Sequence, residues 1–354
     1  MKMSEIVPKL QKEFPKTVYV GDENQKLSIK RLSTGCFMLD MLTGGGVPKN
    51  RNVHIWGNKS CGKTTLALRL AASMMREKPT MKVGFIDFEG TFDKDWATKF
   101  LPSTDNLITV RPDYGEEGVD IARAMIEADD LGMLVIDSLG GITAIKQADA
   151  SATEYAPMAI QVKLINHLLR VIFPFVSQAW KEDRDLTIIL LNQVRINMKA
   201  AKYGSPHSAL GGEYLQHMIS MGIKLGSRVF THSKGVPIKA VHQFKIDKNK
   251  VGLPERSGEF KMWYTDMDGH KAGDIDEDEA VLAYAKRSGV IRREGLKTII
   301  PMRSKPLVFG TQAELLIEFS NNRKLFEKVK AATLKACLKN PLFTANEKED
   351  EKKK

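Results

Sequence analysis

The chain has 354 residues and a formal net charge of +11, and its 42% hydrophobic and 27% charged residues are ordinary proportions for a globular protein. They exclude a disordered or collagen-like chain, and no apolar run approaches the ~18 residues that a membrane-spanning helix needs. Three scattered cysteines fit neither a disulfide framework nor a metal site, so we expect a cytoplasmic protein without a membrane anchor.

Residues 1–30 are polar and too short for a core of their own, so we expect them to pack on another surface. From about residue 31 to 268, apolar strands alternate with amphipathic helices, which predicts an α/β fold with a mostly parallel twisted sheet and helices on both faces. The predicted strands are 53–56, 81–88, 132–138 and 186–194, and the predicted helices are 64–77, 118–131 and 160–180. Three further strands, 221–230, 237–248 and 258–265, follow without helices and predict an antiparallel extension of the sheet.

The pattern changes near Gly269, where helical segments take over. Gly289 is placed to end one helix, and Thr311 followed by Glu314 forms a capping box that opens the next. The sequence therefore predicts an N-terminal oligomerisation segment at 1–30, a core at 31–268, a small C-terminal α-rich domain at 269–345 and a charged disordered tail at 346–354.

Residues 57–64 fit the phosphate-loop (Walker A) pattern GxxxxGK[ST] and lie between a predicted strand and a predicted helix. In that setting the backbone N–H groups and the helix N-terminus bind phosphates, a lysine reaches the β- and γ-phosphates, and a hydroxyl binds Mg²⁺. The residues expected at the phosphates of ATP are Gly57, Asn58, Lys59, Ser60, Cys61, Gly62, Lys63, Thr64 and Thr65.

Polar side chains end three other strands, at the edge where a parallel sheet binds its ligands. Asp137 follows four apolar residues, and we expect it to hold Mg²⁺ through water together with Thr64. Asp87 and Glu89 are alternative candidates for the carboxylate that polarises the attacking water. Gln193 is placed to sense the γ-phosphate.

Six collinear segments within residues 31–268 resemble the RecA recombinases, most closely the bacteriophage RecA/UvsX type. They are Leu32–Gly35 with Leu39, Asp40 and Gly44–Pro48, then GNKSCGKTTL, FIDFEGTFD, LVIDS, LLNQVR with Gly211 and Gly212, and KIDKNKVGLPE. The resemblance implies a RecA-like P-loop NTPase core.

By this resemblance Glu89 is the catalytic glutamate, and Gln193 couples the γ-phosphate to a DNA-binding loop. Lys248 and Lys250 match lysines that reach the ATP of the neighbouring subunit. Trp96 and Tyr264 match aromatic residues that contact the adenine and, across the interface, the nucleotide.

Two polar segments without periodicity, 144–157 and 195–212, match the family's two DNA-binding loops. Residues 151–250, which include the second segment and half of the first, carry 14 Lys and Arg against six Asp and Glu, a net charge of +8 that favours an anionic partner. The residues expected to contact DNA are Met158, Lys163, Arg195, Lys199, Lys202, Tyr203, Gly211 and Gly212.

The expected function is therefore that of a DNA-dependent ATPase that forms helical filaments on single-stranded DNA and catalyses homologous pairing and strand exchange in recombination and repair. The resemblance implies ATP and Mg²⁺ as cofactors, and single- and double-stranded DNA, copies of the same chain, a single-strand-binding protein and a mediator as partners. It places the protein in the cytoplasm of a bacterium or of a phage-infected host. The alternatives are a hexameric helicase with a RecA fold and an ATP-binding regulatory paralogue without strand exchange.

Overall fold

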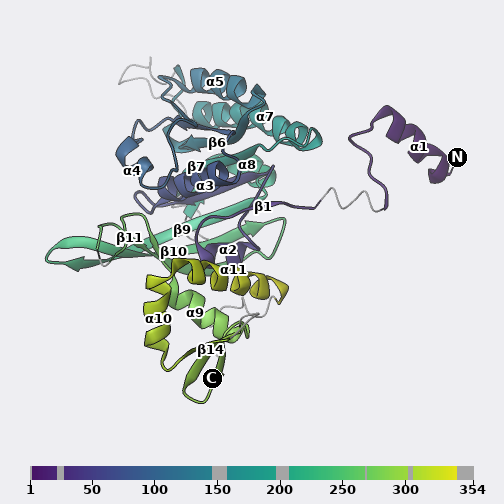
Figure 1. Cartoon of the computed structure of the whole chain (residues 1–354). Coiled ribbons are helices and arrows are strands. Elements are labelled where there is room, and N and C mark those ends of the chain that lie inside the picture. The colour runs from purple at the N-terminus through teal and green to yellow at the C-terminus, as the bar shows by residue number, and fades with distance from the viewer. Residues whose placement is uncertain are drawn as a thin grey trace. The chain divides into compact units, whose positions relative to one another are not determined.

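The computed structural model describes residues 2–21, 28–145, 158–196, 207–267, 269–301 and 306–340 (Figure 1). The described chain divides into two compact units. The first unit comprises the described residues of 1–32, 48–59 and 63–222, and the second those of 33–47, 60–62 and 223–354. The predicted domain boundaries at 30/31 and 268/269 stay predictions.

The first unit contains five parallel strands in the order β3-β7-β6-β4-β5. Its strands are β1 (Arg31–Leu32), β3 (Asn52–Gly57), β4 (Lys82–Asp87), β5 (Leu107–Val110), β6 (Leu131–Asp137), β7 (Thr187–Ile196) and β8 (His207–Ala209). Its helices are α1 (Met3–Glu13), α3 (Lys63–Glu77), α4 (Lys94–Thr98), α5 (Gly115–Glu127), η2 (Leu139–Gly141), α7 (Met158–Lys181) and α8 (Gly212–Met218). The strands and helices predicted for this region from apolar runs and periodicity are confirmed, except that the predicted helix 118–131 ends at Glu127 and Leu131 begins β6.

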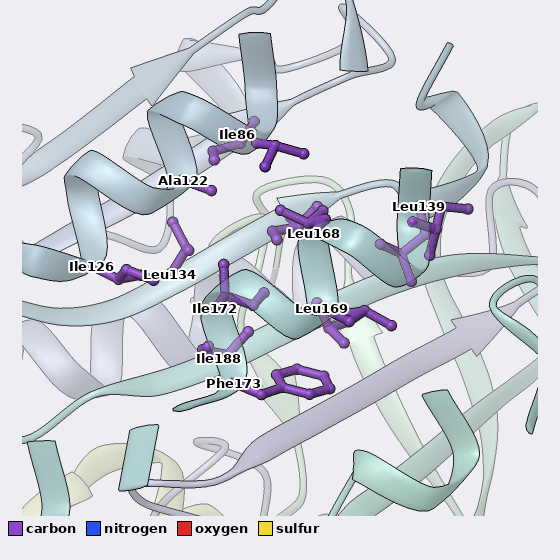
Figure 2. Packing of buried hydrophobic residues seen from close by; sticks show 14 of the residues in the cluster. Ile86, Ala122, Ile126, Leu134, Leu139, Leu168, Leu169, Ile172, Phe173 and Ile188 are labelled. Carbon is purple, nitrogen blue, oxygen red and sulfur yellow. The ribbon is translucent and has the colours of Figure 1, made fainter. Parts of the chain in front are cut away.

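Helices cover both faces of these strands because strand side chains alternate between the two faces and both sets are apolar. One face packs against α5 and α7, where Ile86, Leu134 and Ile188 meet Leu168 and Ile172 (Figure 2). Helix α3 packs against β3, β4, β6 and β7 without belonging to that cluster, so it covers the other face.

Helix α7 contains Ile160–Lys181, the one stretch in the described ranges that is long and apolar enough to cross a membrane. Its residues Leu164, Leu168, Leu169, Ile172 and Val176 lie in the hydrophobic cluster of the first unit. The apolar character of α7 therefore serves the interior of this unit.

The second unit has two groups of strands and a set of helices. Strands β9 (Met221–Ser233), β10 (Val236–Asn249), β11 (Arg256–Trp263) and β12 (Ile275–Asp276) follow one another in the sheet, with β10–β11 and β11–β12 antiparallel. Strands β13 (Arg292–Glu294), β14 (Lys297–Ile300) and β15 (Leu307–Phe309) form a separate antiparallel sheet. The helices are α2 (Phe37–Thr43), α9 (Asp278–Arg287), α10 (Gln312–Asn321) and α11 (Arg323–Lys339), and the short strand β2 (Val47–Pro48) lies at a boundary between the units.

The predicted start of α10 is confirmed at its N-cap. Thr311 Oγ1 accepts a hydrogen bond from the Glu314 N–H at 3.1 Å. The Glu314 carboxylate accepts from the N–H of Gly310 at 2.8 Å, one residue before the position that a capping box uses.

The second unit also contains a buried ion-pair network that no sequence pattern indicated. Glu277 is 6% exposed; its carboxylate accepts a hydrogen bond from the Phe37 N–H at 2.7 Å and pairs with the ammonium of Lys330. This carboxylate therefore ties α2 to α11 across the unit.

His54 in β3 gives the fold a pH-dependent stability. Its ring is fully buried and stacks on Trp56, neither ring nitrogen has a hydrogen-bond partner within the described ranges, and burial lowers its pKa to about 3. Because the unfolded chain takes up a proton below pH ~6.5 and the folded chain does not, stability is retained above that pH and falls as the pH drops toward 3.

We expect His54→Leu to remove about 2 kcal/mol of the difference in unfolding free energy between pH 8 and pH 5. Urea unfolding at the two pH values measures it. The exposed His232→Leu serves as the matched control and should leave the difference unchanged. An unaltered pH dependence in His54→Leu would contradict the buried neutral histidine.

Candidate nucleotide and DNA site

The strand register of the first unit brings the predicted site residues to one edge. Gly57 of β3 lies beside Gln193 of β7, and Asp87 of β4 lies beside Asp137 of β6. All four strands are parallel, so their carboxyl ends meet at this edge. The edge therefore combines the start of the phosphate loop with two carboxylates and an amide.

The phosphate loop turns sharply between β3 and α3. Ser60 and Gly62 adopt left-handed backbone conformations, with φ of +58° and +101°. Lys63 is only 8% exposed, and its Nζ donates to the carbonyl oxygens of Asn58 at 2.9 Å and Gly57 at 3.4 Å. The lysine ammonium is thus held over the loop, where a phosphate group would meet it.

Thr64 and Asp137 contact each other at the start of α3. The Thr64 hydroxyl donates to Asp137 Oδ2 at 2.7 Å, and Asp137 is 4% exposed. Burial raises the pKa of Asp137 to about 6, and the negative charges of Glu89 and Asp87 add to the shift. A hydroxyl and a carboxylate in a region of excess negative charge fit Mg²⁺, which prefers oxygen ligands.

No group of three or more His, Cys, Asp or Glu side chains within the described ranges could hold a metal ion by itself. Thr64 and Asp137 alone offer one hydroxyl and one carboxylate, whereas Mg²⁺ takes about six oxygen ligands. The site therefore fits a magnesium ion that keeps water and phosphate oxygens among its ligands.

Glu89 lies between two hydrogen-bond donors from separate strand ends. Gln193 Nε2 donates to Glu89 Oε1 at 2.7 Å, and the Ser138 hydroxyl donates to the same oxygen. Asp87 is occupied otherwise: its carboxylate accepts from the N–H groups of Thr91 and Phe92 and forms an ion pair with Arg111 at 3.2 Å. This geometry favours Glu89 over Asp87 as the carboxylate that acts on a water molecule.

Trp96, the predicted adenine contact, is half-buried at the start of α4. Its indole Nε1 donates to Thr65 Oγ1 at 3.1 Å, and its ring meets Phe100 edge-on at 5.2 Å. The ring is therefore tied to the first turn of α3, one residue after Thr64. Contact with adenine stays a prediction.

Lys248 and Lys250, the predicted contacts to a neighbour's ATP, lie at the end of β10. Asn249 between them is buried and shapes the turn, because its Oδ1 accepts from the Val251 N–H at 3.1 Å. Burial and the charge of Lys250 lower the pKa of Lys248. Two cations that repel each other at one turn favour the binding of an anion.

The described ends of the second predicted DNA loop, in β7 and β8, pair with each other. Residues 207–209 of β8 pair antiparallel with β7, and Val194 lies opposite Ala209. Gly211 and Gly212 follow at φ of +104° and +61° and start α8. Arg195 lies in β7, whereas Lys199, Lys202 and Tyr203 lie outside the described residues.

The first predicted DNA loop, 144–157, also falls mostly outside the described residues. Met158 and Lys163, its predicted flanking contacts, lie in the first turns of α7, and Lys163 is exposed. Between them Gln161, which is 9% exposed, donates from Nε2 to the carbonyl oxygens of Ile142 at 2.9 Å and Gly140 at 3.1 Å. The start of α7 is therefore fastened to the turn that follows Asp137 and Ser138.

Three residues of this site were missed at the level of sequence: Ser138, Arg111 and Gln161. The sequence position of Ser138 could have indicated its place in the site, because it directly follows Asp137 at the same strand end. Arg111 and Gln161 lie 24 and 19 residues from their partners Asp87 and Ile142, and no local pattern links them.

Comparisons with known proteins agree with this geometry. The RecA N-terminal domain family matches residues 1–268. The chain is 32% identical to the protein RecA of Clostridium botulinum (strain Eklund 17B / Type B) over 270 residues, which cover 75% of this chain and 73% of that protein. It is 30% identical to the protein RecA of a Nitratiruptor species over 293 residues, which cover 82% of this chain and 80% of that protein.

These relatives are bacterial, and the bacteriophage subtype stays a prediction. The α/β fold class is confirmed by the family match together with the parallel strands covered on both faces. From its sequence match and its strand-edge geometry, the chain belongs to the RecA family and is a RecA-type recombinase, a nucleotide- and DNA-binding protein with DNA-dependent ATPase activity that assembles into oligomers.

Proposed function

We propose that this protein binds ATP and Mg²⁺ between neighbouring subunits of a helical filament on single-stranded DNA, and that ATP hydrolysis controls its affinity for DNA. Lys63 and the backbone of residues 57–65 would bind the phosphates, and Thr64 and Asp137 would hold Mg²⁺. Glu89 would orient the attacking water, while Lys248 and Lys250 would reach the nucleotide of the next subunit. Mg²⁺ supplies charge neutralisation on the phosphate oxygens.

The observation that carries this proposal is the contact between Gln193 and Glu89 at 2.7 Å. Gln193 lies in β7, three residues before the described part of the second predicted DNA loop ends at Ile196. A γ-phosphate that hydrogen-bonds Gln193 would compete with Glu89 for the same amide and move the β7 end of that loop. ATP state and DNA affinity would then be linked through a differential contact.

The exposure of helix α1 is an argument that the N-terminal segment takes part in assembly. None of its residues is buried, although it carries apolar side chains such as Met3, which is 66% exposed. We infer that this helix packs on a neighbouring subunit, where its apolar face would be removed from water. A cytoplasmic location, a single-strand-binding protein and a mediator belong to the same proposal and rest on the family alone.

Electron microscopy of the protein with single-stranded DNA and a non-hydrolysable ATP analogue tests the assembly. We expect continuous helical filaments. Closed rings, or the absence of any assembly, would contradict the proposed filament.

Removing both trans lysines tests the shared nucleotide site. We expect Lys248→Ala with Lys250→Ala to abolish ATP-dependent filaments while the thermal unfolding of the isolated protein stays within a few degrees of wild type, since solvent-accessible lysines contribute little to folding. Lys297→Ala with Lys328→Ala removes the same charge from two exposed positions elsewhere and should still form filaments. Normal filaments in the first variant would contradict the trans contact.

A further inference from the structure

A buried histidine of the second unit contacts the phosphate loop. His242 in β10 is 2% exposed, and its Nδ1 lies 3.2 Å from the carbonyl oxygen of Cys61. Its Nε2 lies 3.1 Å from the hydroxyl of Tyr264, and Arg228 donates to that hydroxyl oxygen at 2.8 Å. The side chains of His242, Tyr264 and Arg228 thus form a relay from the loop carbonyl to the surface of the strands.

The donors and acceptors of this relay allow one consistent direction. The Cys61 carbonyl can only accept, so Nδ1 carries the ring proton and donates to it. Nε2 of the neutral ring then accepts from the Tyr264 hydroxyl, whose oxygen accepts from Arg228. Burial lowers the pKa of His242, with a smaller contribution from the charge of Arg228, in agreement with this neutral tautomer.

The ring is also held by packing. His242 stacks on Phe260 with a centroid distance of 4.9 Å and an interplanar angle of 2°. A Cβ at Gly62 would come within 3.2 Å of the histidine ring, so the loop backbone passes close over it. The imidazole therefore has little freedom to leave the Cys61 carbonyl.

The bond to Cys61 fixes the direction of an N–H group. The carbonyl of Cys61 and the N–H of Gly62 belong to one peptide plane, and in a trans peptide they point in opposite directions. A carbonyl held toward His242 therefore turns the Gly62 N–H away from His242. In a phosphate loop, such N–H groups are the ligands of the phosphates.

We propose that His242 is a positioning residue that pre-orients the Cys61–Gly62 peptide for phosphate binding and couples the conformation of the phosphate loop to that of Tyr264. This inference rests on the proposed phosphate-binding role of the loop and assigns its orientation to a residue outside the motif. Tyr264, the predicted contact to a neighbour's nucleotide, would then respond to the nucleotide bound by its own subunit.

Alkylation of Cys61 tests the contact without any activity measurement. Cys36, Cys61 and Cys337 are all buried free thiols. In the nucleotide-free full-length protein, His242→Phe keeps a ring on Phe260 but loses the bond to the loop. We expect the rate at which iodoacetamide modifies Cys61, followed by peptide mass spectrometry, to rise about fivefold while the rates at Cys36 and Cys337 stay unchanged.

Binding of a fluorescent N-methylanthraniloyl ADP measures the consequence for the nucleotide. We expect the dissociation constant to rise about fivefold in His242→Phe and to return to within about twofold of wild type in His242→Asn, whose amide N–H₂ can replace the Nδ1–H donor. His232→Phe, at an exposed histidine of the same unit, should change neither readout.

A double-mutant cycle tests the relay to Tyr264. Tyr264→Phe keeps the aromatic ring and removes the hydroxyl, so it should raise the dissociation constant by about twofold in wild type and leave it unchanged in the His242→Phe background. Independent, additive effects would overturn the relay. An equal increase in the alkylation rate at all three cysteines, or an unchanged rate at Cys61, would overturn the positioning role. The binding of ADP by the wild-type protein is a separate test of the proposed function.

Discussion

Glu89→Gln is expected to lower single-stranded-DNA-dependent ATP hydrolysis by about 10²–10⁴-fold while binding of the fluorescent ADP and filament formation persist. The carboxylate is the only change, because glutamine has nearly the same shape and can still accept the hydrogen bonds that Gln193 and Ser138 donate. The variant therefore separates the activation of water from the binding of nucleotide. Release of phosphate over time and electron microscopy are the two measurements.

Asp87→Asn is the matched control for Glu89→Gln. Asp87 accepts hydrogen bonds from two backbone N–H groups and pairs with Arg111, so its loss should lower stability and should leave much of the turnover of the folded fraction. If Asp87→Asn abolished turnover at unchanged stability and Glu89→Gln retained it, the two carboxylates would have to exchange roles.

Asp137→Asn is expected to abolish magnesium-dependent ATP hydrolysis and, at the same time, to stabilise the nucleotide-free protein by about 1–3 kcal/mol at pH 8. The pKa of Asp137 is raised from 3.8 to about 6, chiefly by burial. A carboxyl whose folded pKa lies above its unfolded pKa destabilises the folded state at any pH above both values. The neutral amide removes this penalty and can still accept the hydrogen bond from Thr64.

The gain in stability should therefore vanish as the pH falls from 8 to below 4, which urea unfolding at several pH values would measure. Asp185→Asn gives the opposite sign, because Asp185 is 6% exposed and its carboxylate pairs with Lys78 at 2.7 Å. Destabilisation by Asp137→Asn at pH 8 would contradict the raised pKa. An inactive but stabilised variant would show that folding energy is given up for metal binding at this position.

The residues of the phosphate loop and Asp137 could be found from sequence because each is fixed by its neighbours along the chain. A strand, a short glycine-containing loop and a helix suffice to place Lys63 and Thr64 at one edge, and strand order brings Asp137 to them. Position along the chain left Asp87 and Glu89 open, and only the family resemblance favoured Glu89. The physical reason involves Arg111 and Ser138, whose proximity to the two carboxylates arises only when separate strands are assembled.

Short or half-exposed elements were the part of the fold that sequence reasoning missed. Strand β5 has exposed side chains at its centre and so lacks the apolar run that marks a buried strand. Strands β13 and β15 have three residues each, too few for periodicity. His242 was missed for a related reason, because a single histidine in an alternating strand gives no local sign that a loop some 180 residues earlier passes over it.

The fastening of α7 to the turn after Asp137 has a consequence for how DNA controls the enzyme. Gln161 holds the carbonyl oxygens of Gly140 and Ile142, and the same turn carries Ser138, which donates to Glu89. The first predicted DNA loop thus reaches Glu89 through α7, and the second reaches it through Gln193. One carboxylate oxygen thus accepts hydrogen bonds from chain segments next to both predicted DNA loops, and DNA bound at either loop would be expected to change the position of Glu89.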